Sequence, residues 1–292
     1  MAHSDPKVLQ ISPLQERELD YAAALVQEAG WNQLAADWRI FLELGTVHAV
    51  RDSGHRVIAT AATLVYGGRF AWISMVLVEG GYRRRGLATQ LLRRCIDDLT
   101  GRGLVPVLDA TPAGRTVYVP FGFQDSWGFS RFVAAAPLRS ERAPPTPNGI
   151  VIRPIGDADL PRLCGYDARV FGADRSGLLR RLRGRLPGAE LGAWRGDQIV
   201  GFVLGRDGRA AAQLGPLVAE DEATATALLG VALVRTQGPI YVDLADSKSA
   251  LQRWLRDRGF APQRPFMRMI YGRAARFDDC ARTMAVAGPE LG

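Results

Sequence analysis

The sequence has few of the residues that build metal sites and disulfide frameworks. Its 292 residues include three histidines and three cysteines. The histidines show no zinc-ligand spacing, and Cys95, Cys164 and Cys280 are odd in number and far apart. No apolar stretch is long enough to span a membrane, and the first ten residues lack the apolar core of a signal peptide. We therefore expect a soluble protein of the reducing cytoplasm, with no bound metal and no membrane partner.

Lysine is also scarce, although the chain is basic. Lys7 and Lys248 are the only lysines, so arginine carries almost all of the positive charge behind the net +7. This positive charge would fit binding to nucleic acid. It would equally fit binding to a polyphosphate, because one planar guanidinium can donate to two phosphate oxygens at once. No recognition helix or aromatic stacking motif favours nucleic acid, and the run RRLRGR at 180–185 is typical of a solvated helix face. We expect no nucleic-acid partner.

Several motifs of nucleotide and hydrolase chemistry are missing. The sequence contains no G-x-x-x-x-G-K-[ST], no G-x-G-x-x-G after a strand and no serine nucleophile elbow. These absences argue against phosphate-loop nucleotidases, dinucleotide-binding folds and serine hydrolases.

The length indicates two domains, with the boundary in a proline-rich stretch. SERAPPTPNG, residues 140–149, has three prolines and little apolar content, as in a surface linker. We expect a first domain at residues 1–139, a linker at 140–149 and a second domain at 150–292.

The first domain has the alternating patterns of a mixed α/β sheet. Gly67-Gly68 joins two β-branched runs, which predicts a hairpin, and residues 87–99 carry one apolar stripe, which predicts an amphipathic helix. The expected strands are 7–11, 46–51, 56–66, 69–78, 104–108 and one after Gly122-Phe123, and the expected helices are 14–29, 32–44, 87–99 and a short one from Pro112.

The second domain repeats this order of elements. Gly259-Phe260 matches Gly122-Phe123 in its place after a helix and before a last strand, which indicates a tandem duplication. The expected strands are 150–153, 190–194, 198–205, 210–218, 240–244 and 267–271, and the expected helices are 158–171, 175–186, 222–235, one ending in WLRDRGF and a short one near 277–284.

The stretch VEGGYRRRGLATQLLRRC, residues 78–95, joins a strand to the amphipathic helix. The first N–H groups of a helix have no partners within it, and the helix dipole favours negative charge there, so a phosphate is a natural ligand. Gly86 would let that phosphate approach without a Cβ in the way, and residues 83–85 add three arginines. An ordinary solvated basic turn is the alternative.

This turn and a second block resemble the GNAT acetyltransferase superfamily. The family's acetyl-CoA loop, [RQ]-x-x-G-x-[GA], is matched by Arg83-x-x-Gly86-x-Ala88, five positions after Val78. Its Y-x-x-x-G-F block is matched by Tyr118-x-x-x-Gly122-Phe123. The resemblance covers residues 7–135, and the whole chain is similar to a tandem bacterial subgroup with a degenerate second copy. It implies two tandem GNAT-like acyl-CoA N-acyltransferase domains.

The resemblance also implies acetyl-CoA as cosubstrate and a set of site residues. The pyrophosphate would be held by the amides of Arg83, Arg84, Arg85, Gly86, Leu87, Ala88 and Thr89. The pantetheine arm would pair with the strand end Val76, Leu77 and Val78, where one amide polarises the thioester carbonyl. Tyr118 would give a proton to the departing thiolate. Alternatively, its ring only covers the core.

The base and the acceptor site are less well specified. The strand FAWISMVLV carries no carboxylate, although some GNAT members have a glutamate there. Asp109 could deprotonate the amine through water, or it could hold a loop, which we favour. Trp31 and Asn32 lie in the segment that lines acceptor sites in GNAT proteins. Alternatively, Trp31 fills a helix joint and Asn32 caps a helix.

The second copy has lost the features of a CoA site. Its turn, after Val218, is three residues shorter, has no glycine and carries acids at 220–222, and Leu255 stands opposite Tyr118. Carboxylates repel a pyrophosphate, so this copy is expected to cover the acceptor site, to form a homodimer surface or to bind an effector. Asp174-Arg175 could contact a ligand, although a cap by Asp174 is the favoured reading.

The sequence therefore predicts an acetyl-CoA-dependent N-acetyltransferase that transfers the acetyl group directly to a small amine or amino-acid-like acceptor. A non-catalytic regulatory protein that binds CoA or an effector is the alternative. Tight CoA binding without acetyl transfer to any amine would favour it.

Overall fold

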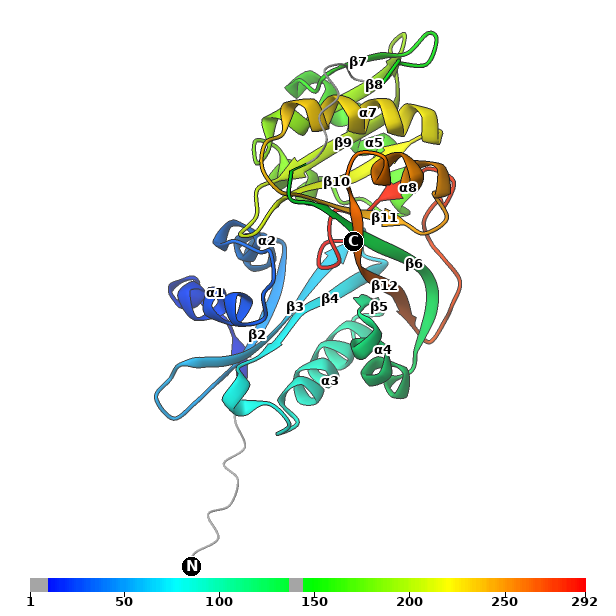
Figure 1. The fold of residues 1–292 in the computed structure, drawn as a ribbon. Coiled ribbons are helices and arrows are strands. Elements are labelled where there is room, and N and C mark those ends of the chain that lie inside the picture. The colour runs from blue at the N-terminus through cyan, green and yellow to red at the C-terminus, as the bar shows by residue number, and fades with distance from the viewer. Residues whose placement is uncertain (1–9, 137–143) are drawn as a thin grey trace, which may run out of the picture.

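The strands in residues 10–136 and 144–292 join one mixed sheet (Figure 1). The structure is a computed structural model that describes residues 10–136 and 144–292, so residues 7–9 of the expected first strand and 140–143 of the expected linker lie outside it. The strand order is β1-β2-β3-β4-β5-β12-β6-β11-β13-β10-β9-β8-β7. The predicted mixed α/β architecture is confirmed.

The two halves of the chain repeat one order of elements, which confirms the predicted duplication. The first half contains β1 Ile11–Pro13, α1 Leu19–Glu28, α2 Ala35–Leu44, β2 Gly45–Arg51, β3 Val57–Tyr66, β4 Phe70–Val78, α3 Leu87–Thr100, β5 Val105–Ala110, α4 Pro112–Tyr118 and β6 Phe123–Ala134. The second half contains β7 Val151–Pro154, α5 Leu160–Phe171, α6 Ser176–Leu182, β8 Leu191–Arg195, β9 Gln198–Arg206, β10 Ala212–Ala219, α7 Glu222–Arg235, β11 Ile240–Ala245, α8 Ser249–Arg256, β12 Ala261–Tyr271 and β13 Thr283–Ala285.

Local sequence explains the elements that shape the site. Gly67 and Gly68 have positive φ, +55° and +64°, in the three-residue turn 67–69 that joins Tyr66 of β3 to its partner Phe70 of β4. The apolar stripe of α3 is buried against β3, β4 and β5, whereas α1 and α2 cover the other face of this sheet (Figure 1). The same apolar core continues from α1 and α2 to α5 and α6 of the second half.

The two halves exchange strands β6 and β12 in the middle of the sheet. β12, from the second half, lies between β5 and β6, and β6, from the first half, pairs with β11 (Figure 1). The expected boundary at residues 140–149 therefore divides the chain but not the sheet. The exchange brings residues more than 100 positions apart to one place in the middle of the molecule.

One expected element is wrong. Residues 277–284 form no helix; turns lead into strand β13, which pairs with β10 and β11. Phe277 stacks on Phe70 with ring centroids 4.0 Å apart, so tertiary contacts decide the path of this segment. A short, weakly patterned stretch gives no periodic signal that would have revealed this.

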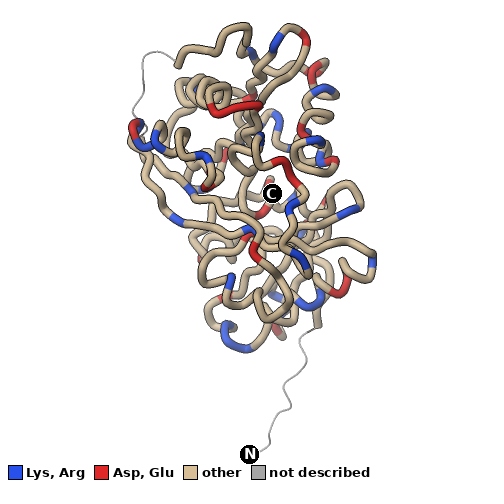
Figure 2. The backbone as a smooth tube through the Cα atoms, turned by 90° about the vertical axis from the view of Figure 1, so that its right-hand side faces the viewer, with Lys and Arg blue, Asp and Glu red and all other residues tan. Residues whose placement is uncertain are grey.

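In the arginine run at 180–185, Arg181, Arg183 and Arg185 are ion-paired. The expected solvated helix face is wrong for Arg183 and Arg185, because α6 ends at Leu182 and these two side chains are only 19% and 13% exposed. Arg183 meets Asp157 at 2.6 Å, and Arg185 meets Asp37 at 3.0 Å. Lys and Arg positions and Asp and Glu positions are interspersed over the backbone (Figure 2). None of the helices in residues 10–136 and 144–292 is long and apolar enough to cross a bilayer. In the same ranges, no group of three histidine, cysteine or acidic side chains could hold a metal ion.

Candidate active site

The turn before α3 leaves a row of backbone amides without acceptors. Gly86 is the N-cap residue of α3 and has φ +77°. In the part of the chain that the structure describes, the amides of residues 84–89 donate to no protein acceptor. A Cβ built on Gly86 would meet only the side chain of Gln90, at 3.8 Å. Since the helix dipole adds positive potential, this turn fits a phosphate group.

Two of the three arginines in the turn fix its shape. Arg83 donates to the Val78 carbonyl at 3.0 Å and to Glu28 of α1 at 2.9 Å. Arg85 donates to the Gly81 carbonyl at 3.0 Å. Arg84 has a positive φ, +62°, and its guanidinium contacts no acid among the described residues. Arg84 is therefore the side chain of the three that is free to contact a ligand.

Strands β4 and β5 separate next to this turn. Their parallel pairing covers only residues 70–72 and 105–107. A bulge then follows in β4, where Met75 has φ +52° and its carbonyl accepts a hydrogen bond from Thr60 Oγ1 at 2.9 Å. From Val76 to Val78, the β4 edge that faces away from β3 pairs with no described strand. An extended ligand can add to such an edge as a strand would.

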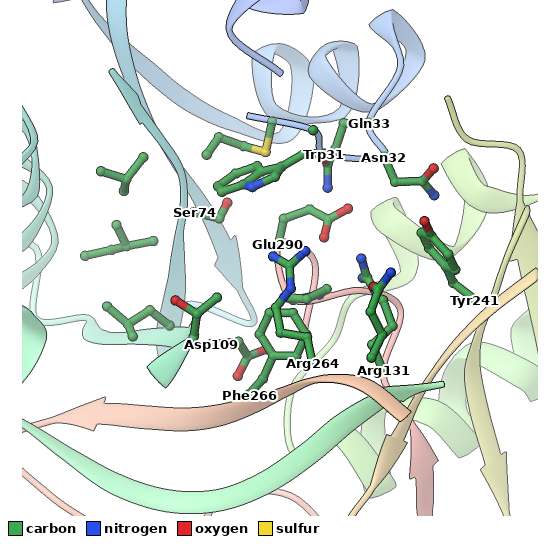
Figure 3. A pocket seen from close by; sticks show the side chains of 18 of the residues that line it. Trp31, Asn32, Gln33, Ser74, Asp109, Arg131, Tyr241, Arg264, Phe266 and Glu290 are labelled. Atoms are coloured by element: carbon green, nitrogen blue, oxygen red, sulfur yellow. The ribbon is translucent and has the colours of Figure 1, made fainter. Parts of the chain in front are cut away.

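A cavity of about 300 Å³ opens at this separation (Figure 3). Four residues predicted for catalysis or acceptor binding line it, together with one from the predicted CoA strand: Trp31, Asn32, Val76, Asp109 and Tyr118. The phosphate turn itself lies outside the cavity lining. The structure thus brings the predicted acceptor and catalytic residues to one place and connects that place to the CoA strand.

Tyr118 ends α4 and faces the cavity. Its ring lies edge-on to Phe123, at a centroid distance of 6.2 Å, so it also covers part of the core. Burial raises the pKa of the Tyr118 phenol above its ordinary value. The phenol therefore keeps its proton at neutral pH, which an acid that serves a thiolate requires.

Asp109 does not have the geometry of a base, which argues against the catalytic candidate and for the structural alternative that we favour. Both of its carboxylate oxygens accept from Arg268 of β12 at 2.9 Å, and one also accepts from Trp72 Nε1 at 3.3 Å. The side chain of Asp109 is 0% exposed. Burial raises its pKa and the Arg268 guanidinium opposes that rise. Asp109 joins β5 to the exchanged strand, which agrees with the structural alternative.

Asn32 lines the cavity, but its side-chain amide also has a structural role. Its amide nitrogen donates to the Ala211 carbonyl at 2.9 Å, and its oxygen accepts from the amides of Ala210 and Ala211 at 2.8 and 3.1 Å. It is not the N-cap of α2, because Leu34 occupies that position. Trp31 is half-buried and borders the cavity, so it remains our candidate acceptor wall.

Replacing Asn32 with alanine should destabilise the protein by about 1–3 kcal/mol, because two amides and one carbonyl lose buried partners. Urea denaturation measures this change. The matched control is Asn148→Ala, at an exposed turn position, which should cost less than about 0.5 kcal/mol. Equal stability of both variants would show that Asn32 does not join the halves.

Sequence reasoning missed the residues that the strand exchange brings to the cavity. They are Arg131 of β6, Tyr241 of β11, Arg264 and Phe266 of β12, and Glu290, together with Gln33 and Ser74 from the first half (Figure 3). Glu290 forms an ion pair with the buried Arg206, which also contacts Asp37 of α2 at 2.9 Å. No local pattern marks the residues on β6, β11, β12 and at Glu290, because their proximity depends on long-range strand pairing. Gln33 and Ser74, in contrast, lie within two residues of the predicted Asn32 and Val76.

The second copy fills both parts of its own site with protein. At the start of α7, the Asp221 carboxylate accepts from the Thr224 amide at 2.7 Å, where the first copy has free amides. Strand β13 pairs with both β10 and β11 and occupies the position that is open between β4 and β5. Leu255, opposite Tyr118, is fully buried. This copy has neither the anion site nor the acid, as predicted.

Asp174 bonds the first turn of α6, as the favoured reading expects, but Arg175 and not Asp174 occupies the N-cap position. Asp174 Oδ1 accepts from the Ser176 amide at 2.8 Å at the start of α6. Arg175 is buried in an ion pair with Asp167 at 2.8 Å. Both side chains therefore have partners within the second half.

Comparisons with known proteins agree with this architecture. Residues 13–123 match the model of the acetyltransferase (GNAT) family, and residues 163–281 match that of an acetyltransferase (GNAT) domain. The uncharacterized N-acetyltransferase YitH of Bacillus subtilis is 22% identical over 248 residues, 85% of this chain and 86% of that protein.

Solved structures share the fold over the whole length. A proposed acetyltransferase from Pyrococcus horikoshii matches with a TM-score of 0.75 and 20% identity, covering 100% of both chains. A tandem GNAT protein from the clavulanic acid biosynthesis pathway matches with a TM-score of 0.64 and 16% identity, covering 92% of this chain and 100% of that one. With two GNAT models matched one after the other, this chain belongs to the GNAT superfamily of N-acetyltransferases and contains two GNAT domains.

Proposed function

We propose that the protein transfers an acetyl group from acetyl-CoA directly to a small amine bound in the cavity between the two halves. The contrast between the two copies carries this proposal. In the first copy the helix N-terminus and the gap between β4 and β5 are open, whereas in the second copy the chain's own carboxylate and strand β13 fill them. In the second copy, strand β13 lies in the gap between β10 and β11. This supports an extended pantetheine arm in the equivalent gap between β4 and β5 of the first copy.

In this proposal each part of the open site has one task. The amides of residues 84–89 hold the pyrophosphate, and the free edge of Val76 to Val78 holds the pantetheine arm and polarises the thioester carbonyl. The amine nitrogen attacks that carbonyl, so a C–N bond forms and the C–S bond breaks. Tyr118 gives its proton to the departing thiolate.

The proposal assigns no carboxylate as general base. The two acids in the cavity lining, Asp109 and Glu290, are both ion-paired with buried arginines. The acceptor must therefore bind as the neutral amine and lose its second proton to water. As a result, kcat/KM should rise with pH up to the pKa of the acceptor amine.

Tyr118→Phe should lower kcat by about 100-fold or more, within the range typical of a lost general acid. Acetyl-CoA affinity should change by less than about threefold, because the phenol does not hold the cofactor. The control Tyr21→Phe, at an exposed position on α1, should leave kcat unchanged. Equal kcat in Tyr118→Phe and wild type would leave the tyrosine with only its packing role.

Calorimetry with acetyl-CoA and a thiol-release assay with a panel of small amines test the function as a whole. We expect one acetyl-CoA site per chain and turnover with at least one amine. Binding without turnover on any amine would support the regulatory alternative, and no binding would refute the cofactor site.

A further inference from the structure

The cavity contains a positive charge without a matching acid. Arg264, Arg131 and Asp243 form one row across β12, β6 and β11, because Arg264 pairs with Arg131 and Arg131 pairs with Asp243 in the strand registers. Asp243 gives both oxygens to Arg131, at 2.8 and 2.7 Å. Of the two guanidinium groups in this row, only that of Arg131 contacts the carboxylate, and like charges opposite each other in a sheet are destabilising.

Arg264 is the unbalanced member of this row. Four charged side chains line the cavity: Asp109, Arg131, Arg264 and Glu290. The other three are ion-paired with Arg268, Asp243 and Arg206, but Arg264 meets no acid in residues 10–136 and 144–292. A bulge in β12 before Arg264 breaks the register with β6, and bulges commonly re-aim a side chain at a site.

The opposite side of the cavity presents hydrogen-bond acceptors. Gln33 and Ser74 are each 8% exposed, and neither Gln33 Oε1 nor Ser74 Oγ has a hydrogen-bond partner among the described residues. Both side chains line the cavity, with Arg264, Arg131 and Tyr241 on its other side (Figure 3). Ser74 lies on β4, two residues before Val76, so these acceptors are close to the free edge. Buried polar groups are normally satisfied, so a ligand is the expected partner.

We propose that the acceptor is an amine that also carries a carboxylate, as in an amino acid. Its carboxylate binds Arg264, with the remaining donor of Arg131 and the Tyr241 hydroxyl beside it. Its amino group lies toward Gln33 and Ser74, next to the strand that presents the thioester. A cavity of about 300 Å³ restricts this acceptor to a small molecule. The inference rests on the proposed function and specifies its substrate class.

Matched pairs of compounds test the inference. The probes are the common L-amino acids, β-alanine and γ-aminobutyrate, each beside its amide, with acetyl-CoA and a thiol-release readout. For at least one pair, the carboxylate should have a kcat/KM at least about tenfold above that of its amide. Arg264→Gln should reduce kcat/KM for the carboxylate by about 10–100-fold, mainly through KM, and change the amide by less than about threefold.

Two further variants separate charge from packing. Arg264→Lys keeps the charge and should recover part of the carboxylate preference. Arg253→Gln makes the same change as Arg264→Gln at an exposed position on α8 and should leave both substrates unaffected. If Arg264→Gln lowers kcat/KM for the acid and its amide equally, the carboxylate site is refuted.

A binding readout separates this inference from the proposed function. Saturation-transfer NMR of the same pairs, with wild-type protein and no acetyl-CoA, should show binding of carboxylates that Arg264→Gln loses. If acetyl-CoA binds and amines are acetylated, but acids show no preference over amides, the substrate class is wrong and the function stands. If the acids bind through Arg264 but acetyl-CoA does not bind, the function fails and the anion site stands. The inference is overturned if NMR shows no binding of carboxylates and the thiol-release assay shows no preference for acids over amides.

Discussion

Gly86→Glu should lower the affinity for acetyl-CoA by at least about 100-fold. Three effects act in the same direction. The residue has φ +77°, which costs a non-glycine residue about 1–3 kcal/mol. A side chain would enter the space in front of the free amides, and its negative charge would repel the pyrophosphate at the start of α3. Calorimetry with acetyl-CoA measures the loss directly.

The chain offers a close control for this substitution. Gly103 follows α3, has φ +70° and would place a Cβ in open space. Gly103→Glu therefore introduces similar backbone strain and the same charge at the far end of the helix, and it should leave acetyl-CoA affinity within about threefold. Gly86→Ala isolates the strain and should reduce affinity less than Gly86→Glu. Wild-type affinity in Gly86→Glu would mean that the turn does not hold the cofactor.

The cofactor turn could be predicted from the sequence because it depends on neighbouring residues. A strand, a turn with positive φ and an amphipathic helix follow each other within residues 70–100, and the signals for all three are local. The loss of this site from the second copy could be predicted for the same reason, since acids at 220–222 stand where the first copy has its arginines.

The acceptor cavity could not be predicted in the same way. Arg131, Tyr241 and Arg264 belong to three strands that pair only because the two halves exchange strands β6 and β12. The partners of Asn32 and Asp109 are 179 and 159 positions away in the chain. Each residue was a reasonable site candidate by its place near a strand or helix end. Only the long-range pairing shows that their polar groups are already used within the protein.

That pairing makes Asp109→Ala the substitution with the largest expected cost in stability. Arg268 is 1% exposed, its guanidinium lies between Trp72 and Trp127 at 4.6 and 4.5 Å from their ring centroids, and Asp109 provides its ion pair. Removing the carboxylate leaves a buried cation without compensation, which typically costs about 3–5 kcal/mol. The broken ion pair joins β5 of the first half to β12 of the second half. Both halves should therefore unfold together, at a lower urea concentration than in the wild-type protein.

A second substitution at this position, Asp109→Asn, separates the structural role of Asp109 from the base role. If Asp109 were the general base, Asp109→Asn would lower kcat severely with little change in the free energy of unfolding. A structural ion pair predicts the reverse: lower stability, with kcat within about tenfold of wild type at a temperature where the protein stays folded. The control Asp97→Ala removes an exposed carboxylate from α3 and should cost less than about 0.5 kcal/mol. The contacts with Arg268 and Trp72 favour the structural outcome, because a base that gave up these bonds during turnover would leave the buried arginine unpaired at that moment.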